Sequence, residues 1–453
     1  MKKIIIILAV AALGGCGIYK PYTRPEVRTD GLYGEGVEES DEQTIGELSW
    51  RQMFTDPQLQ ELIGQGLENN TDMLTAHQRV AEAEAALKSA RLAYIPSFNF
   101  APQGTLASFD FAPVSKTYNV PVTAGWQIDI FGGLTNAKRR ARAAYSQTLE
   151  YRQAVHAQLV SGIANIYYTL LMLDAQLDVT TQTAEKWRQS TQMMRDMKEA
   201  GMTNEAAVAQ YEGNAYAIEA SLEDLKYQIR QVENSLCTLL GDTPHSIARG
   251  RLADQTLPDN VSVGVPLNVL ANRPDVRASE YALMQAYYAT AEARSALYPS
   301  ITLSGAAGWT NSAGSMIVNP GKFLWSVVGQ LVQPIFNAGA GRARLKIMKA
   351  QQEEARLAFR QTLLDAGAEV NNALAQTQSA RAKADLRRRQ IASMERAVES
   401  TELMMRHSST TYLEVLTAQQ SLLSAQLSQI ADRFDELQGT VNLYRALGGG
   451  GEE

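Results

Sequence analysis

Polar and apolar residues alternate strictly between Tyr118 and Ile130. The even positions are apolar and the odd positions are mostly polar, which is typical of a β-strand with two different faces. After the break Phe131-Gly132-Gly133, the chain from Leu134 to about Ala200 contains no proline and reads as one helix. A helix of this length would form a rod of roughly 100 Å at about 1.5 Å for each residue. Because globular helices average about 11–12 residues, the pattern predicts an elongated protein.

The same pattern occurs a second time further along the chain. Residues 323–335 read as a strand, residues 336–341 form a break, and residues 342–406 read as a second long helix. Upstream of the two strand regions, shorter helices end at Pro96 and at Pro299, since the residue before a proline disfavours helix. The corresponding positions are offset by about 205 residues, so the sequence predicts two tandem copies of one structural unit.

Each long helix is followed by a return helix with an apolar stripe. The first return helix is predicted over residues 205–240, and the second follows Tyr412. Apolar residues recur alternately every three and four positions, an average of about 3.5 that is typical of a coiled-coil seam. A long helix and its return helix can therefore pack side by side. The stripes consist of Tyr211, Ala215, Ile218, Leu222, Leu225, Ile229, Val232, Leu236 and Leu239, and of Leu416, Leu423, Leu427, Ile430, Phe434, Leu437, Val441 and Tyr444.

These patterns divide the chain into six parts, which we name by their residue ranges. Residues 1–15 form a signal peptide, 16–55 an extended N-terminal tether, 56–241 the first repeat, 242–267 an irregular equatorial linker, 268–447 the second repeat, and 448–453 a disordered tail. The first repeat contains strands at about 97–108 and 117–131, and the second contains strands at about 300–310 and 323–336. The residues 311–321, which are rich in Asn, Ser and Gly, are predicted to form a loop.

The N-terminus carries a short export signal. Lys2 and Lys3 precede an apolar core that is too short to span a membrane as a helix. The segment Leu13-Gly14-Gly15-Cys16 resembles a bacterial lipobox, in which cleavage leaves a lipidated Cys16. The alternative is an ordinary secretory signal with a chance cysteine. Cys237 is then the remaining cysteine; it lies on an apolar helix stripe and is predicted to be a core residue.

Composition narrows the class of protein. The formal net charge is −6, which gives nucleic-acid binding no electrostatic support. The four histidines are scattered and no phosphate loop or paired-cysteine metal motif occurs, so we expect no enzyme and no cofactor apart from a covalent lipid on Cys16. Several methionines gather near the ends of the long helices. Thioethers bind soft monovalent metals, but packing between helices is the favoured interpretation of Met193, Met194, Met197, Met202, Met404 and Met405.

Four strands of this length suit an outer membrane but cannot close a barrel. A tilted strand crosses the hydrocarbon layer with about 9–11 residues, and known membrane barrels begin at about 8 strands. Two chains would supply 8 strands around a plugged interior, whereas three would supply 12 around a duct. The sequence therefore predicts a mainly α protein with a membrane β part, in which several copies share one barrel.

Six short motifs occur in order along the two copies: WQIDIFGGL (126–134), NRPDVRASE (272–280), LYPSITLSG (297–305), QPIFNAG (333–339), YLEVLTAQQSL (412–422) and VNLYRALGGG (441–450). With these motifs the chain resembles a TolC-type outer-membrane efflux duct, in the lipoprotein branch of the outer-membrane factor family. The resemblance covers nearly the whole mature chain. It implies a homotrimer with a 12-stranded β-barrel, a periplasmic α-helical tunnel and an equatorial belt.

The resemblance also implies where the tunnel closes. Glu414 matches the first acidic position of the family's tip motif, whereas Thr417 stands where some relatives have a second Asp. Gly201 keeps a turn glycine that Ser408 replaces in the second copy. The alternative role of Glu205 is to stabilise the start of its helix through the helix dipole. The predicted aperture and adaptor-facing tips comprise Gly201, Asn204, Glu205, Ser408, Thr411 and Glu414.

The function that these expectations imply is a passive trimeric duct in the outer membrane. It would receive substrates from an inner-membrane RND-type transporter through a periplasmic adaptor protein and release them outside. Its other contacts would be with outer-membrane lipid, and none with nucleic acid. The alternative is a structural periplasmic coiled-coil lipoprotein without a pore. The sequence does not identify the exported compound.

Overall fold

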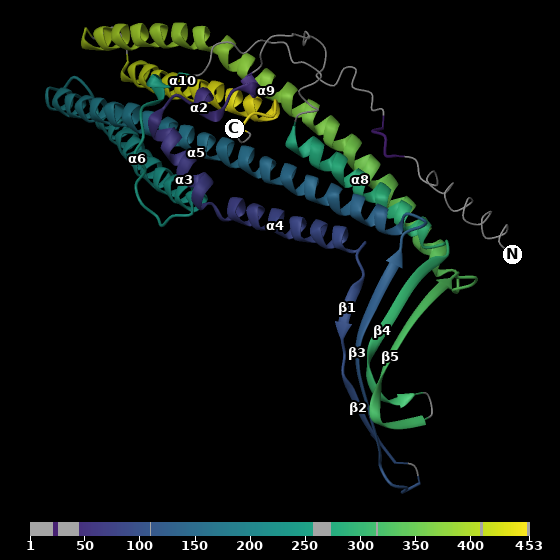
Figure 1. Ribbon diagram of the computed structural model, residues 1–453. Helices are drawn as coiled ribbons and strands as arrows, with labels where there is room; N and C mark the ends of the chain where they lie inside the picture. Colours follow the sequence, from purple (N-terminus) through teal and green to yellow (C-terminus); the bar gives the residue numbers. More distant parts are fainter. Residues whose placement is uncertain are drawn as a thin grey trace. The chain divides into compact units, whose positions relative to one another are not determined.

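The computed structural model describes residues 21–25, 45–108, 110–256, 273–313, 316–407 and 411–450 (Figure 1). The chain divides into two compact units. The first unit comprises residues 1–27, 78–150 and 277–361, and the second comprises residues 28–77, 151–276 and 362–453. The predicted signal peptide and Cys16 lie outside the described residues, as do Ser408, most of the tether and part of the linker.

The same order of elements occurs twice, in agreement with the predicted repeat. Both long helices, α5 and α9, have 67 residues and run through both units. The first copy comprises α4 (Thr71–Leu92), β1 (Ser97–Phe100), β2 (Gln103–Ala107), β3 (Ser115–Ile128), α5 (Gly133–Glu199) and α6 (Glu205–Leu240). The second comprises α8 (Pro274–Ser295), β4 (Ser300–Ala313), β5 (Met316–Val332), α9 (Ala340–Arg406) and α10 (Tyr412–Ala446).

Three short elements precede the first copy, and one lies in the linker. They are η2 (Ile45–Glu47), α2 (Trp50–Met53), α3 (Pro57–Asn69) and η3 (Leu252–Asp254). Among the described helices, none is both long enough and apolar enough to cross a membrane.

The strands of the first unit form one antiparallel sheet in the order β1-β3-β4-β5, with β2 also paired to β3. β3 and β4 lie in the middle of the sheet (Figure 1). β1 and β2 together form one edge, and β5 forms the other. Within the described residues, neither edge has a further strand to pair with. Both edges therefore present backbone hydrogen-bonding groups that need partners.

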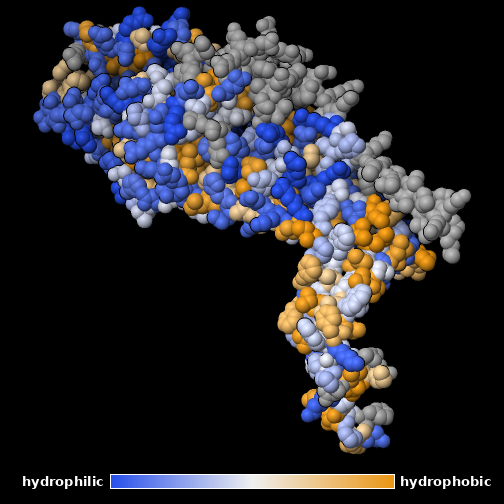
Figure 2. Space-filling view, viewed as in Figure 1, coloured by the Kyte–Doolittle hydropathy of each residue, from blue (hydrophilic) through white to orange (hydrophobic). Residues whose placement is uncertain are grey.

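The register places the predicted apolar residues on one face. Val122 of β3 lies opposite Phe100 of β1 and Ala307 of β4, and Ala307 in turn lies opposite Trp325 of β5. Because directly opposed residues share a face, the even positions of β3 continue across the whole sheet. Figure 2 shows hydrophobic residues gathered over the strands. The apolar face carries Phe98, Phe100, Val120, Val122, Trp126, Ile128, Ile301, Leu303, Ala307, Trp309, Phe323, Trp325, Val327 and Leu331.

The opposite face is mainly polar. Thr123 lies between Asn99 and Ala306, and Ala306 lies opposite Ser326. Two layers further along this face, Gln127, Thr302 and Gln330 lie side by side. The sheet therefore has one side suited to hydrocarbon and one suited to water, which is the alternation of a membrane strand around an aqueous interior.

The first strand is interrupted, whereas a continuous strand over 97–108 was predicted. Pro102 separates β1 from β2, because proline has no N–H to donate to a ladder. The N–H of Ala101 still donates to Pro121 at 3.3 Å, so the two pieces stay on the same neighbour.

The prediction of a loop over 311–321 is wrong, because β4 runs to Ala313 and β5 begins at Met316. Asn311 explains the error. Its Oδ1 accepts from the N–H of Tyr118 at 2.7 Å, and its Nδ2 donates to the carbonyl of Lys116 at 2.8 Å. The side-chain amide thus takes the place of ladder bonds beside a register shift between Thr310 and Ser312. A polar, turn-forming composition therefore conceals a strand here.

Two segments predicted to be irregular are folded. Ser49 and Gln52 form a reciprocal capping box that starts α2 inside the predicted tether, and Trp50 and Met53 are buried. At the other end, Gly449 and Gly450 are buried, although the tail was predicted to be disordered from Gly448. The carbonyl of Gly450 lies 2.6 Å from Nδ1 of the buried His156, so this histidine holds the tail.

The second unit has a helical core that contains the predicted apolar stripes. None of the predicted stripe residues is exposed, and Tyr211, Leu236, Leu416, Leu437 and Val441 are buried.

Arg249 fastens the linker to the helices of the second unit. Its Nη2 donates to Asp174 at 3.0 Å and its Nη1 to Glu233 at 2.6 Å. The hydrogen bond to Asp174 is the largest cause that raises the pKa of Arg249, so the guanidinium stays charged.

A left-handed glycine ends α6. Gly241 has φ +73°, and the N–H groups of Gly241 and Asp242 bind the carbonyls of Thr238 at 3.1 Å and Cys237 at 2.8 Å. This is the Schellman pattern. A Cβ at Gly241 would lie 2.6 Å from the carbonyl oxygen of Asn69, at the end of α3.

We expect Gly241→Ala to destabilise the protein more than Gly201→Ala. Both positions are left-handed, which costs a side chain about 1–2 kcal/mol. Gly201 has no atom within 4 Å of an added Cβ, whereas Gly241 meets backbone and should lose roughly 1–3 kcal/mol more through overpacking. Thermal unfolding followed by the helical circular dichroism signal measures the difference. Equal losses in the two variants would contradict the close approach of α3 to α6.

Candidate functional site

The first predicted tip is the turn between α5 and α6. Gly201 has φ +74°, its N–H binds the carbonyl of Lys198 at 3.0 Å, and the N–H of Met202 binds the carbonyl of Met197 at 2.8 Å. The turn is therefore a Schellman motif that requires glycine at this position. Gly201 and Met202 are exposed, so the turn presents its backbone to the surroundings.

Asn204 and Glu205 start the return helix. Oδ1 of Asn204 accepts from the N–H of Ala207 at 3.0 Å, which makes Asn204 the N-cap of α6. Glu205 lies in the first turn and forms an ion pair with Lys198. The sequence reasoning did not include Lys198. Because the charge of Glu205 is compensated across the turn, Glu205 contributes little net negative charge to the tip.

The second tip is described on the side of α10. Thr411 occupies the N-cap position, with extended backbone and without a capping hydrogen bond from its side chain. Glu414 lies in the first turn of α10 and its side chain is exposed. Ser408, the proposed counterpart of Gly201, lies outside the described residues. The two tips therefore differ in their caps: the side chain of Asn204 caps the first return helix, whereas the side chain of Thr411 makes no capping hydrogen bond to the second.

The two helical hairpins share one hydrophobic core near these tips. Trp187 and Met194 of α5 and Tyr211 of α6 pack with Met405 of α9 and Val415 of α10. Met194 and Met405 are 1% and 5% exposed, which confirms helix packing as the role of these two methionines. Met193 and Met197 pack against the same core. Met202, by contrast, is exposed on the turn.

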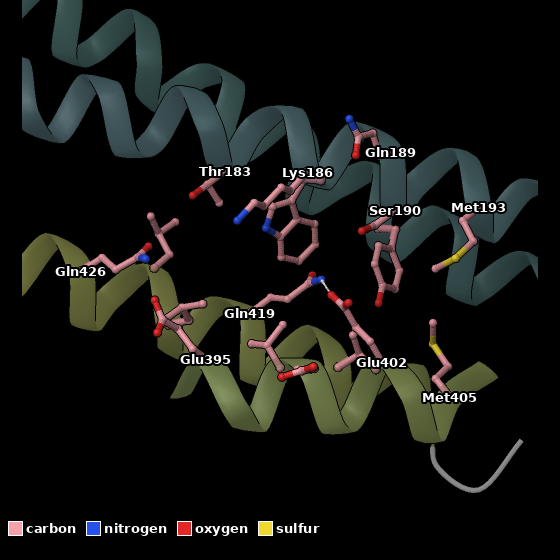
Figure 3. Close-up of a pocket in the computed structure, with 17 residues that line it drawn as sticks. Thr183, Lys186, Gln189, Ser190, Met193, Glu395, Glu402, Met405, Gln419 and Gln426 are labelled. Atoms are coloured by element: carbon pink, nitrogen blue, oxygen red, sulfur yellow. Dashed lines mark hydrogen bonds between the residues drawn. The ribbon is translucent and has the colours of Figure 1, made fainter. Parts of the chain in front are cut away.

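A pocket of about 500 Å³ lies between the hairpins beside this core (Figure 3). Lys186 and Met193 line it from α5, and Glu402 and Met405 line it from α9. Nε2 of Gln419, on α10, donates to Oε1 of Glu402 at 2.9 Å. Glu395 and Glu399 also line it, so the pocket is rimmed by carboxylates from α9.

Tyr211 lines the pocket from α6. Its ring lies 5.5 Å from that of Trp187, and the residue is 1% exposed. Burial, followed by the charge of Glu402, raises the pKa of Tyr211 to about 12. The phenol is therefore neutral at any physiological pH.

Other candidate residues have structural roles. Cys237 is buried, as predicted, and its Sγ lies 3.6 Å from Nδ1 of His245. That contact joins the predicted core cysteine to one of the four scattered histidines. Among the described residues, no three His, Cys, Asp or Glu side chains come together as a metal site would require. The structure thus supplies tips, a pocket and a two-faced sheet as the features that can carry function.

A family model for outer membrane efflux proteins matches residues 62–242 and 265–449. The chain belongs to this family. The two matched segments each cover one copy of the repeat, so the same family model fits both copies.

Curated relatives match over almost the full length. The chain is 28% identical to the cation efflux system protein CusC of Escherichia coli K12, over 99% of each chain. It is also 28% identical to the probable efflux pump outer membrane protein TtgC of Pseudomonas putida, over 99% of this chain and 96% of that protein.

Solved channels have the same fold. A crystal structure of CusC superposes with a TM-score of 0.83 at 28% identity and covers 96% of this chain and all of that one. The MtrE outer membrane channel of Neisseria gonorrhoeae, in its open state, gives a TM-score of 0.84 at 25% identity, over 96% and 98% of the chains. The protein is therefore an efflux channel of the outer membrane, and the resemblance found in the sequence is confirmed.

We expect Asn204→Ala to loosen the first turn of α6, because the cap to the Ala207 N–H is lost. Loss of an N-cap costs about 1 kcal/mol, which corresponds to roughly fivefold faster amide exchange through local opening. Asn204→Asp keeps an acceptor and should leave exchange near the wild-type rate. Hydrogen exchange read by mass spectrometry on the peptide that spans the turn measures both variants. If amide exchange in Asn204→Asp were as fast as in Asn204→Ala, the side chain at position 204 would not act as a cap.

Proposed function

We propose that three copies of this chain form a passive duct, in which a shared 12-stranded barrel continues into an α-helical tunnel in the periplasm. The observation that carries this proposal is a sheet with one apolar face, one polar face and two unpaired edges. An open edge in hydrocarbon leaves each backbone group unsatisfied at several kcal/mol. Pairing β5 of one copy with β1 and β2 of the next satisfies both edges.

The number of copies follows from the interior. The polar face carries Thr123, Gln127, Thr302, Ser304 and Gln330 from neighbouring strands. Two copies would give a barrel of about 8 strands, whose interior side chains fill it, whereas larger barrels enclose channels. Polar residues line an interior that holds water, so three copies fit both the pairing and the chemistry.

The duct would depend on partners for energy and specificity. We propose a periplasmic adaptor protein and an inner-membrane RND-type transporter, with a lipid on Cys16 as a second anchor and no further cofactor. The relatives named for cations and for efflux pumps of other kinds are equally identical to this chain, at 28%. Overall identity therefore assigns no substrate class. A periplasmic coiled-coil lipoprotein without a pore would have no need of the apolar sheet face.

The tips would form the periplasmic aperture and the surface that meets the adaptor. Gly201, Asn204 and Glu205 supply the first tip, and Ser408, Thr411 and Glu414 the second. Three copies of Glu414 around a threefold axis would form an acidic ring.

The apolar face can be tested with matched lysine variants of adjacent residues. Val122→Lys should cost roughly 2–4 kcal/mol near the bilayer midplane, because the ammonium would enter hydrocarbon. Thr123→Lys points the same group to the polar face and should preserve assembly. The yield of heat-modifiable trimer after refolding into vesicles measures both variants. Equal loss in the two would mean that the faces are assigned wrongly, and folded protein without any conductance would refute the duct.

The aperture can be tested by single-channel conductance of purified trimers in planar bilayers. A narrow acidic ring attracts cations, so Glu414→Gln should lower cation selectivity and weaken block by divalent ions. Glu205→Gln is the matched control, because Lys198 already compensates that carboxylate. Unchanged selectivity in Glu414→Gln would place this residue outside the constriction.

A further inference from the structure

A second large pocket, of about 810 Å³, lies in the first unit between α8, α9 and the segment Pro21–Pro25, which we call the strap. The strap is held against both helices. The ring of Tyr22 lies edge-on to that of Tyr287 of α8 at 5.7 Å. Arg24 reaches Glu280 of α8 at 3.4 Å, and its guanidinium lies 5.6 Å from the ring centre of Phe359 of α9. Five residues of chain are thereby fixed as one wall of a pocket.

The pocket is cationic. Arg294, Lys349 and Arg356 line it, against one carboxylate, Glu353. The carboxylate of Glu353 accepts hydrogen bonds from Nη2 and Nε of Arg356, at 2.5 and 2.9 Å. Arg294 and Lys349 are exposed, and neither has an ion pair among the described residues. Two uncompensated cations therefore face one pocket in a chain whose overall charge is −6.

A buried donor points to a ligand as well. The hydroxyl of Tyr22, which lines the same pocket, is buried and has no hydrogen-bond partner within the described part of the chain. A buried polar group without a partner costs about 1–3 kcal/mol. Burial raises the pKa of Tyr22 to about 12, so the hydroxyl keeps its proton and remains able to donate. An acceptor such as a phosphate oxygen would satisfy it.

The pocket also has apolar walls, beside the polar side chains of Thr23, Thr290 and Gln352. Leu283, Ala291 and the strap prolines supply aliphatic walls beside Tyr287. A small inorganic anion has no use for such walls, whereas the glycerol and first methylenes of a lipid do. The combination of cations, a phenol donor and aliphatic surface fits an amphiphile with a phosphodiester head.

The position of the pocket agrees with this occupant. Arg294 lies in the last turn of α8, and β4 with its apolar face begins at Ser300. The strap begins at Pro21, so a lipid on Cys16 could be at most about 18 Å away along an extended chain. A lipid on the chain inserts outside the barrel, so the strap and the pocket would lie on the outer surface beside the inner leaflet. This step rests on the proposed barrel and anchor.

We propose that the strap, α8 and α9 form a binding site for an anionic phospholipid of the inner leaflet. Arg294 and Lys349 hold the phosphodiester, and the hydroxyl of Tyr22 donates to it. The aliphatic walls receive the glycerol region. The bound lipid fixes the strap to the helices next to the bilayer, so the N-terminal anchor and the barrel share one lipid-filled surface.

The test measures phosphatidylglycerol binding to delipidated full-length trimers by native mass spectrometry and by titration. Arg294→Gln/Lys349→Gln should weaken binding roughly 10- to 30-fold, since each cation near an anionic surface contributes about fivefold. Arg388→Gln/Arg389→Gln is the matched control, because both arginines lie far along α9, are exposed and pair with Asp385 in their own helix. The control should bind as the wild type does.

Tyr22→Phe separates a ligand site from a structural contact. Without its hydroxyl the lipid-free trimer should melt at the same or a higher temperature, while phosphatidylglycerol binding weakens several-fold. Lower thermal stability with unchanged lipid binding would overturn the role of Tyr22. Trimer yield and conductance of each variant verify that folding and the duct persist, so a failure of the lipid site is distinguishable from a failure of the proposed function.

Two further measurements distinguish a phospholipid from a free phosphate ion as the ligand. Phosphatidylcholine vesicles should bind weakly, and inorganic phosphate at matched concentration should not displace phosphatidylglycerol. Displacement by inorganic phosphate would make this a free-anion site and overturn the lipid assignment. Unchanged binding by the Arg294→Gln/Lys349→Gln variant would overturn the site itself.

Discussion

The unpaired edges of the sheet are the constraint on which the rest of the structure depends. β3 and β4 are paired on both sides, but the described residues leave β5 and the β1–β2 edge each with one neighbour only. In water such edges can be solvated, whereas hydrocarbon offers nothing to bind them. A sheet with an apolar face and open edges therefore cannot be the finished object in a membrane. The proposed assembly is a consequence of backbone hydrogen bonding before it is a consequence of any side chain.

The duplication of the chain produces the sheet to which this constraint applies, because both copies supply strands to it. Each copy supplies strands followed by a helix of 67 residues, so every strand pair is directly continuous with a rod. Left-handed glycines end several of these helices. Gly201 ends α5 through a left-handed turn that a side chain would strain, and Gly241 and Gly448 do the same for α6 and α10. Helix ends are thus fixed by single glycines, while helix faces are fixed by long apolar stripes.

Much of this architecture could be predicted from the sequence, because it rests on periodicity. Alternation in β3 and the stripe of α6 are long patterns, and both faces were assigned correctly from Val122 and Tyr211 outward. The predictions failed where a single side chain, and not a periodic pattern, determines the local structure. Pro102 divides an edge strand, and Asn311 supplies ladder bonds from an amide, so a strand looks like a loop.

The candidate site was less predictable, because its features depend on contacts between distant segments. Lys198 compensates Glu205 across a turn, and Met194 meets Met405 from another hairpin. The strap shows the same limit, since Tyr22 and Arg24 meet Tyr287 and Glu280 far along the chain. No spacing rule joins these residues, and only the folded chain brings them together.

The equal similarity of this chain to relatives with different names has a physical explanation. Relatives named for cations and for other efflux pumps are equally identical to this chain. The residues that specify the fold are strand faces, helix stripes and turn glycines, and these pack or pair with other parts of the chain. The polar sheet face, with its Thr, Ser and Gln side chains, can form hydrogen bonds with water and has no feature that fits one particular solute. In the proposed duct, the choice of substrate would therefore rest with the proteins that bind it. Specificity within this chain would then rest on the carboxylates at the tips and on the proposed lipid site beside the strap.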